Sequence, residues 1–174
     1  MENSTPLVVT PSLKRRLISM VYEFLLLTAV EIFIVGVYTL VTLNLHSALL
    51  DGGRNIVVVL AAAAYFVYSW SGSGHTLAMK TWRIKLVKVG YPTVPPRAAA
   101  LRFVYAWGAI APALIIIHLM KLMTSSAGTR MALAILGANI VLWAMTAFLD
   151  KDRQFLHDKL AGTRLIELPK RAKK

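Results

Sequence analysis

Four long apolar stretches constrain this chain more than any other feature of its sequence. They cover residues 17–45, 53–70, 101–123 and 131–149, and each is close to the roughly 20 residues that a helix needs to cross a bilayer. Hydrophobic residues make up 57% of the 174 residues, more than a single soluble core of this size would bury. The sequence therefore predicts an all-α membrane protein with four transmembrane helices.

The first apolar stretch follows a basic segment, as the apolar region of a signal peptide does. It is too long for such a region, and Glu31 lies where a cleavage motif would be needed. We therefore expect it to remain as the first span.

Lys and Arg are distributed very unevenly over the connections between these stretches. The segment before the first span, the 71–100 loop with Arg102 and the segment after residue 149 hold 17 of them, and the two other connections hold 3. Since cytoplasmic loops of membrane proteins are enriched in Lys and Arg, both termini are predicted to be cytoplasmic. The net charge of +12 would by itself suggest a nucleic acid partner, but the basic residues flank the apolar stretches. The basic end PKRAKK instead predicts contact with anionic lipid headgroups. No aromatic interleaving or folded module accompanies the charges, so we expect no nucleic acid partner.

The loop over residues 71–100 has the pattern of a folded element. Its TLAMK segment favours one helical turn, and the alternation from Arg83 to Val89 predicts a short strand. A second β-prone run extends from Thr163 to Leu168, and we predict that the two pair as a small cytoplasmic β element. An isolated hairpin is marginally stable, so helix ends or headgroups must cover it. The expected organisation is a flexible tail over 1–13, one domain over 14–168 and a basic tail over 169–174.

Three polar residues inside the spans are candidates for an ion or proton path. Glu31 is the middle residue of the first stretch, where an ionised carboxyl costs roughly 2.5–3.5 kcal/mol. It either carries a proton or cation, or stays neutral and hydrogen-bonded to another helix, for example to Asn139. His118, in the outer part of the third stretch, is either a proton relay or a structural group. Pro112 predicts a kink that frees a backbone carbonyl, which a neighbour must satisfy.

Residue patterns of catalytic and ligand-binding sites are missing from the sequence. We find no nucleophile with a matching base, no phosphate loop and no cofactor motif, and the chain contains no Cys. The run DKDRQFLHDK contains three Asp and a His, but also three cations, which favours salt bridges over a metal site. We therefore expect no enzyme activity, no cofactor and no bound metal.

Three segments carry a family resemblance: RRLISMVYEFLLL, SGSGHTLAMKTWRIKLV and FLDKDRQFLHDKLAGTRLI. In their order and spacing they resemble the RDD family of bacterial integral membrane proteins, named for one Arg and two Asp. Arg16 takes the Arg position, Glu23 replaces the first Asp, and Asp158 takes the second. The resemblance implies a polar network of these three side chains. The supporting motif residues are Gly74, Thr76, His157, Gly162 and Thr163.

The same resemblance implies a multi-pass protein of the bacterial inner membrane. Some family members are proposed to exchange sodium or other cations for protons. One expected function is therefore a small oligomeric cation–proton exchanger, with Glu31 as its carboxylate and Arg16, Glu23 and Asp158 as a cytoplasmic gate. The alternative is a non-catalytic membrane assembly factor or an accessory subunit of a larger membrane complex. Either function implies a homo-oligomer or another membrane-protein partner.

Overall fold

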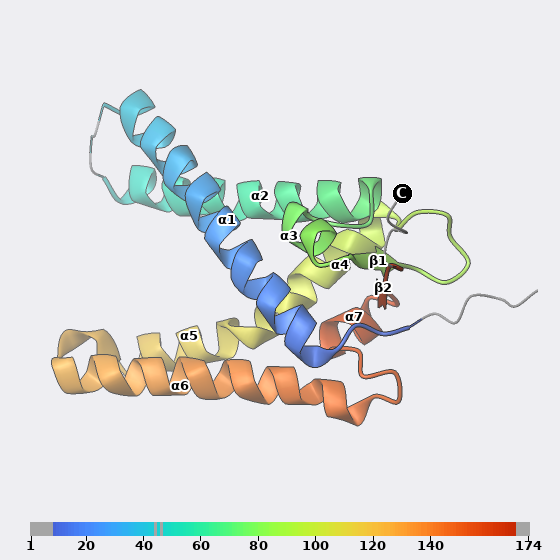
Figure 1. Cartoon of the computed structure of the whole chain (residues 1–174). Helices are drawn as coiled ribbons and strands as arrows, with labels where there is room; N and C mark the ends of the chain where they lie inside the picture. The colour runs from blue at the N-terminus through green and yellow to red at the C-terminus, as the bar shows by residue number, and fades with distance from the viewer. Residues whose placement is uncertain (1–8, 44, 46, 170–174) are drawn as a thin grey trace, which may run out of the picture.

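The structure, a computed structural model, describes residues 9–43, 45 and 47–169. Within them the chain is mostly helical, with a two-stranded sheet near one end (Figure 1). The five longer helices are α1 (Leu13–Val41), α2 (Ala48–Gly72), α4 (Pro96–Ala106), α5 (Ala111–Leu119) and α6 (Ser126–Met145). One-turn 3-10 helices adjoin them at Trp107–Ala109, Leu122–Thr124 and Thr146–Leu149.

Three helices are long and apolar enough to cross a membrane: Leu13–Val41, Ala48–Gly72 and Ser126–Leu149. The predicted third span is instead a pair of helices, Pro96–Ala109 and Ala111–Leu119, bent by 43°. The described part of the chain thus contains three candidate spans, or four if the bent pair is one span. These three helices begin four or five residues before the predicted spans, because Ser12, Ser47 and Ser125 each accept a hydrogen bond at the helix start.

The break in the third span lies just before Pro112, as a proline kink requires. Pro112 has no N–H to donate to the carbonyl of Gly108, one helical turn earlier. Asn139 of α6 satisfies the free carbonyls, since its Nδ2 lies 3.2 Å from the oxygen of Gly108 and 2.6 Å from that of Ala109. A Cβ on Gly108 would lie 2.3 Å from the ring of Trp143, so glycine is needed for this close approach. The predicted kink is confirmed, and the structure identifies Asn139 as the neighbour that satisfies the freed carbonyls.

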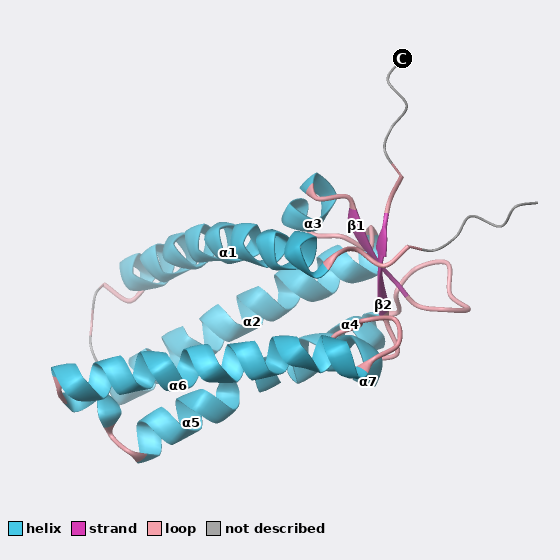
Figure 2. Ribbon diagram, turned by 60° about the horizontal axis from the view of Figure 1, so that its bottom comes forward, coloured by secondary structure: helices cyan, strands magenta, loops and turns pink. Residues whose placement is uncertain are grey.

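The spans form two pairs that meet at one end of the molecule. α1 packs against α2 and α5 packs against α6, while α4 connects the pairs through its contacts with α2. Figure 1 shows the pairs close together at the right and spread apart at the left, and Figure 2 shows the small sheet at the right-hand ends of the helices. We call the meeting end the cap end and the opposite end the far end.

The cap, residues 73–95 and 150–169, contains α3 (Leu77–Thr81), β1 (Ile84–Val87), α7 (Leu156–Leu160) and β2 (Arg164–Glu167). The strands pair antiparallel, with Ile84 opposite Glu167 and Val87 opposite Arg164, so the predicted pairing is confirmed. β1 begins one residue later than predicted because Arg83 has a φ of 55° and ends the α3 turn. The predicted TLAMK turn is α3.

A small hydrophobic core holds the cap against the helix ends. Ile84, Leu86 and Leu165 of the sheet are almost fully buried, and they pack with Trp70 of α2 and Ala99 of α4. These helix ends are the covering surface that the hairpin needed.

The end of β2 also contacts the segment before α1. The N–H of Glu167 donates to the carbonyl of Val9 at 2.8 Å, and Pro11 is buried. Residues 9–12 of the expected flexible tail therefore pack on the sheet. Residues 1–8, and residues 170–174 of the basic tail, lie outside the described part. Figure 1 places the start of α1 and β2 at the same end of the bundle.

Candidate functional site

A first polar cluster surrounds Asp158, on the first turn of α7. Its side chain is fully buried, and its Oδ1 accepts a hydrogen bond from Nε of Arg102 at 2.6 Å. The Arg102 guanidinium also lies over the ring of Trp70, 4.1 Å from the centroid. This ion pair fixes α7, which follows the last span, to α4 of the bent pair.

Arg16 of α1 belongs to the same cluster and is only 2% exposed. Its guanidinium lies 4.4 Å from the ring centroid of Phe155, a cation–π contact. Its Nε and Nη1, like Oδ2 of Asp158, are buried without a hydrogen-bond partner among the described residues. Two buried arginines from different helices therefore lie near one carboxylate, which pairs with Arg102. The charge of Arg16 is opposed by Asp158 only at longer range, without an ion pair among the described residues.

His157 lies between two aromatic rings in this cluster. Its ring is stacked with Trp143 at 6.3 Å and with Phe155 at 5.5 Å between centroids. The indole of Trp143 donates to Nδ1 at 3.1 Å, and because an indole only donates, His157 is the neutral tautomer with its hydrogen on Nε2. Burial is the largest cause that lowers the pKa of His157 to about 4. The charge of Asp158 raises this pKa, and the charges of Arg102 and Arg16 lower it. His157 is thus an uncharged structural acceptor at neutral pH.

The Gly-Thr pair of the third motif ends α7. Gly162 has a φ of 65°, a left-handed conformation that favours glycine after a helix. Thr163 then donates to the carbonyl of Asp158 from both its N–H, at 2.9 Å, and its hydroxyl, at 3.2 Å. The motif therefore sets the short helix that presents Asp158 and turns the chain into β2.

A second polar cluster surrounds Glu23 of α1. The hydroxyl of Tyr65 of α2 donates to Oε1 at 2.6 Å, and the hydroxyl of Thr76 donates to Oε2. Thr76 also caps α3, since its oxygen accepts from the N–H of Met79 at 3.2 Å. One carboxylate thus connects two spans with the start of the cap.

Gly74 allows the chain to turn between α2 and α3. Its φ is 79°, and its carbonyl accepts from the N–H of Leu86 at 2.6 Å. A Cβ at this position would lie 2.7 Å from the carbonyl oxygen of Leu86, too close for any side chain. The glycine of the second motif is therefore required both by its φ and by the adjacent strand.

The three motif residues of the predicted network lie in two clusters. Arg16 and Asp158 share the first, whereas Glu23 bonds to hydroxyl groups in the second. From the sequence, Arg102 is only a basic residue at a helix start, and neither Tyr65 nor Trp143 is among the candidate residues. An arginine near the start of an apolar span needs a counter-charge, and that requirement was the available signal for Arg102.

The three candidates for an ion or proton path do not form a polar cluster with one another. Asn139 satisfies the broken span, so the hydrogen bond considered between Asn139 and Glu31 does not form. Glu31 is half-buried on α1, and its carboxyl has no hydrogen bond or ion pair among the described residues. His118 is exposed in the last turn of α5, also without such a partner there.

The charged run before α7 forms the predicted salt bridges. Asp150 pairs with Lys159 at 3.2 Å, and Asp152 pairs with Arg164 at 2.9 Å. Asp150 also accepts the backbone N–H of Gln154, and this bond is the largest cause of its lowered pKa. These contacts hold the turn between α6 and α7.

Comparison with known proteins adds one finding to this geometry. A family model matches residues 10–162, most of the chain, and it is the model of the RDD family. No curated protein and no solved structure matches the chain. The matched range contains both polar clusters and all the motif residues except Thr163.

Proposed function

The chain belongs to the RDD family, and from this premise we propose that it exchanges cations for protons across the bacterial inner membrane as a homo-oligomer. In this proposal the bent pair counts as one span, so four spans place both termini on one side. The excess of Lys and Arg at the cap end supports a cytoplasmic cap.

The Glu31 carboxyl is the observation on which the proposal rests. It lies near the middle of α1, a 29-residue apolar helix, with no polar partner among the described residues. An ionised carboxyl at this depth is costly, whereas a protonated one, or one that binds a cation, is much less so. Glu31 therefore has the properties of a site that alternates between a proton and a cation.

The position of Glu31 on α1 supports exchange within an oligomer. Glu31 follows Glu23 by eight residues, so it lies about 80° around the helix from the face that Glu23 presents to α2. Two small cavities border the helix ends, one beside Gly74 and one beside Tyr38, and Glu31 lines neither. A second copy against α1 would supply the missing wall of a path.

The two polar clusters have a supporting role in this proposal. Their carboxylates are already engaged, Asp158 by Arg102 and Glu23 by two hydroxyls. They position the cap across the cytoplasmic ends of the spans, where it controls access to the path.

Proton movement in proteoliposomes tests the proposal. Purified protein should acidify or alkalinise the lumen when sodium or potassium is added, and Glu31→Gln should abolish this response. Asp152→Asn, which removes a carboxylate from a partly exposed surface ion pair, is the matched control and should retain it. Full activity in Glu31→Gln, or no activity in the wild type, would exclude cation–proton exchange by this residue.

The second candidate function is that of an accessory subunit, and the carboxyl of Glu31, unpaired among the described residues, supports it as well. A different membrane protein with a polar group facing α1 would satisfy Glu31 as well as a second copy would. Native purification decides between the two. A stable heterologous partner that is lost in Glu31→Leu, together with no ion movement by the pure protein, supports the accessory subunit.

A further inference from the structure

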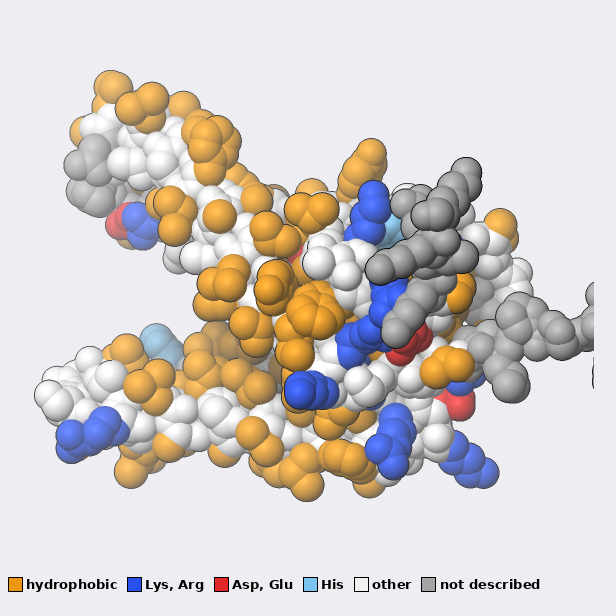
Figure 3. All heavy atoms as spheres, in the orientation of Figure 1, with side chains coloured by type: hydrophobic (Ala, Val, Ile, Leu, Met, Phe, Trp, Pro, Cys, Tyr) orange, Lys and Arg blue, Asp and Glu red, His pale blue; other side chains and the backbone are white. Residues whose placement is uncertain are grey.

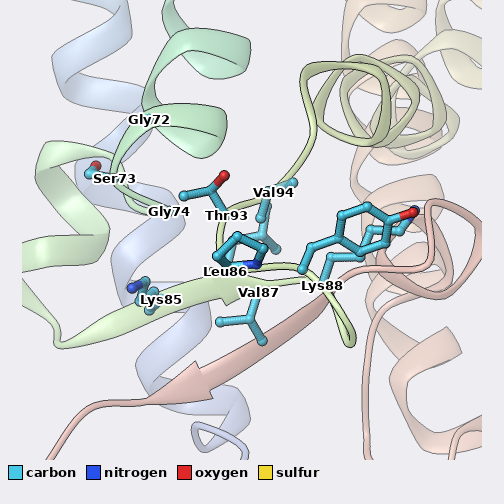
Figure 4. A pocket seen from close by; sticks show the side chains of 11 residues that line it. Gly72, Ser73, Gly74, Lys85, Leu86, Val87, Lys88, Thr93 and Val94 are labelled. Carbon is cyan, nitrogen blue, oxygen red and sulfur yellow. The ribbon is translucent and has the colours of Figure 1, made fainter.

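A cavity of about 40 Å³ lies where α2 meets the cap. Its walls come from the end of α2, from β1 and from the loop before α4. Figure 4 shows Thr93 and Leu86 at its centre, with Lys85 on one flank and Lys88 on the other. Gly74 forms part of the wall. The side-chain carbons of Lys85 lie against this glycine, with Cε 3.0 Å from the position that a Cβ of residue 74 would take.

The surroundings of this cavity are strongly positive. Residues 71–100 contain five Lys and Arg and no Asp or Glu. The acids elsewhere in the cap are engaged by other cations, in the pairs Asp150–Lys159, Asp152–Arg164, Asp158–Arg102 and Glu167–Arg15. Lys85 and Lys88 therefore have no carboxylate partner among the described residues.

The pKa of His75, which follows Gly74 in the cavity wall, indicates the same positive potential. Burial is the largest cause of its lowered pKa, and Lys85 and Lys80 lower the pKa further. No carboxylate opposes them. A positive field at a concave site favours an anion.

The size and chemistry of the cavity fit a phosphate group. A water needs roughly 10–15 Å³ of such volume, so about 40 Å³ accepts about three groups of that size, enough for the two free oxygens of a phosphodiester. The hydroxyl of Thr93 adds a donor to the two ammonium groups, whereas that of Ser73 donates to the carbonyl of His75 at 2.9 Å. A complete lipid headgroup does not fit inside, so the rest of the molecule would extend through the opening.

We propose that this cavity binds the phosphate of an anionic phospholipid, between Lys85 and Lys88. A lipid is favoured over a free ion because Gly72 and Ser73, at the end of the α2 span, line the cavity. The end of a span lies at the level of the headgroups, where acyl chains can pack along α2. The bound lipid would join the second span to the cap.

Native mass spectrometry of the full chain, purified with phosphatidylglycerol, tests this site. The wild type should retain one phosphatidylglycerol in preference to phosphatidylcholine. Lys85→Gln and Lys88→Gln should each weaken retention about fivefold, the loss expected for one basic group near a membrane surface. Lys151→Gln removes the same charge from an exposed turn outside the cavity and should leave retention unchanged.

Four outcomes would overturn the proposal. Equal loss in Lys151→Gln would show diffuse attraction to the surface, and equal retention of phosphatidylcholine would show that the negative charge is not recognised. Displacement of the lipid by millimolar inorganic phosphate would identify a free anion as the ligand. If a Gln variant fails to fold, Lys85→Arg and Lys88→Arg keep the charge and should retain the lipid, and loss in both would equally contradict the site.

Discussion

The cap end and the far end of the bundle are stabilised in different ways. At the cap end, buried charges and hydroxyls connect α1, α2, α4 and α7, and aromatic rings pack against both buried arginines. Towards the far end, the helix pairs separate and expose apolar side chains over most of their surface, as the space-filling view in Figure 3 shows for one face. There Tyr38 connects the first pair through the carbonyl of Leu50, at 2.8 Å.

The difference between the two ends follows from the way helices associate in a bilayer. In a bilayer, apolar side chains gain little by packing together, because lipid is as apolar as they are. Specific association of spans then depends on polar contacts and close packing, and this chain concentrates its polar contacts at the cap end. The far end relies on the bilayer or on another protein to cover it. The following changes test that contrast.

Asp158→Asn should have the largest effect. It leaves Arg102 and Arg16 buried without a carboxylate, and loss of one partner of a buried ion pair costs about 3–5 kcal/mol. Thermal unfolding of the purified protein in detergent measures this loss. Asp152→Asn, in an exposed pair, should cost less than about 1 kcal/mol, and equal effects of the two changes would contradict the buried role of Asp158.

Acid should weaken the cap end through His157. The folded pKa is about 4 and the unfolded value 6.5, so the unfolded chain binds more protons between these values. The stability from neutral His157 is complete above pH 6.5 and is lost as the pH falls towards 4, by roughly 3 kcal/mol in total. Unfolding in detergent across this range measures it. Because glutamine does not titrate, the stability of His157→Gln should fall less than that of the wild type between pH 6.5 and pH 4. Identical pH profiles of the two proteins would contradict the role of His157.

Gly74→Ala should destabilise the junction of α2 and the cap by about 2–3 kcal/mol. The change forces a left-handed φ on Ala and places its Cβ against the carbonyl of Leu86. Gly90→Ala is a matched control, because Gly90 has a φ of 81° but nothing within 4 Å of its Cβ position. It should cost only about 1 kcal/mol for the backbone. Thermal unfolding of both variants gives the difference, and no difference would remove the steric argument.

The smallest effects should come from replacing a glutamate by glutamine, at Glu23 in the second polar cluster and at Glu31 away from it. Glu23→Gln removes a charged acceptor of two hydroxyls and should cost about 1–2 kcal/mol. Glu31→Gln removes a carboxyl without a partner in a single chain, so the stability of the monomer should not fall. Comparison of the two variants in dilute detergent measures this. A loss in Glu31→Gln that depends on protein concentration would instead locate Glu31 at an interface between copies.

Much of this protein follows from local sequence pattern. The apolar stretches identified the span-forming segments, and the missing N–H of Pro112 located the break in the third span. Alternation identified the first strand, and a β-prone run identified the second. Gly162 and Gly74 were identifiable as motif residues. Each of these depends on the conformational preference of a short segment, which is encoded in that segment alone.

The assignment of partners was decided only by the tertiary structure. Arg102 is 56 residues from Asp158 and Tyr65 is 42 residues from Glu23, and no local pattern relates them. The same is true of Asn139, which pairs with the broken span rather than with Glu31. Sequence by itself determined which segments are apolar and where the chain turns, because those properties are local. Which buried charge meets which counter-charge depends on how the spans cross, and that is a property of the assembled helices.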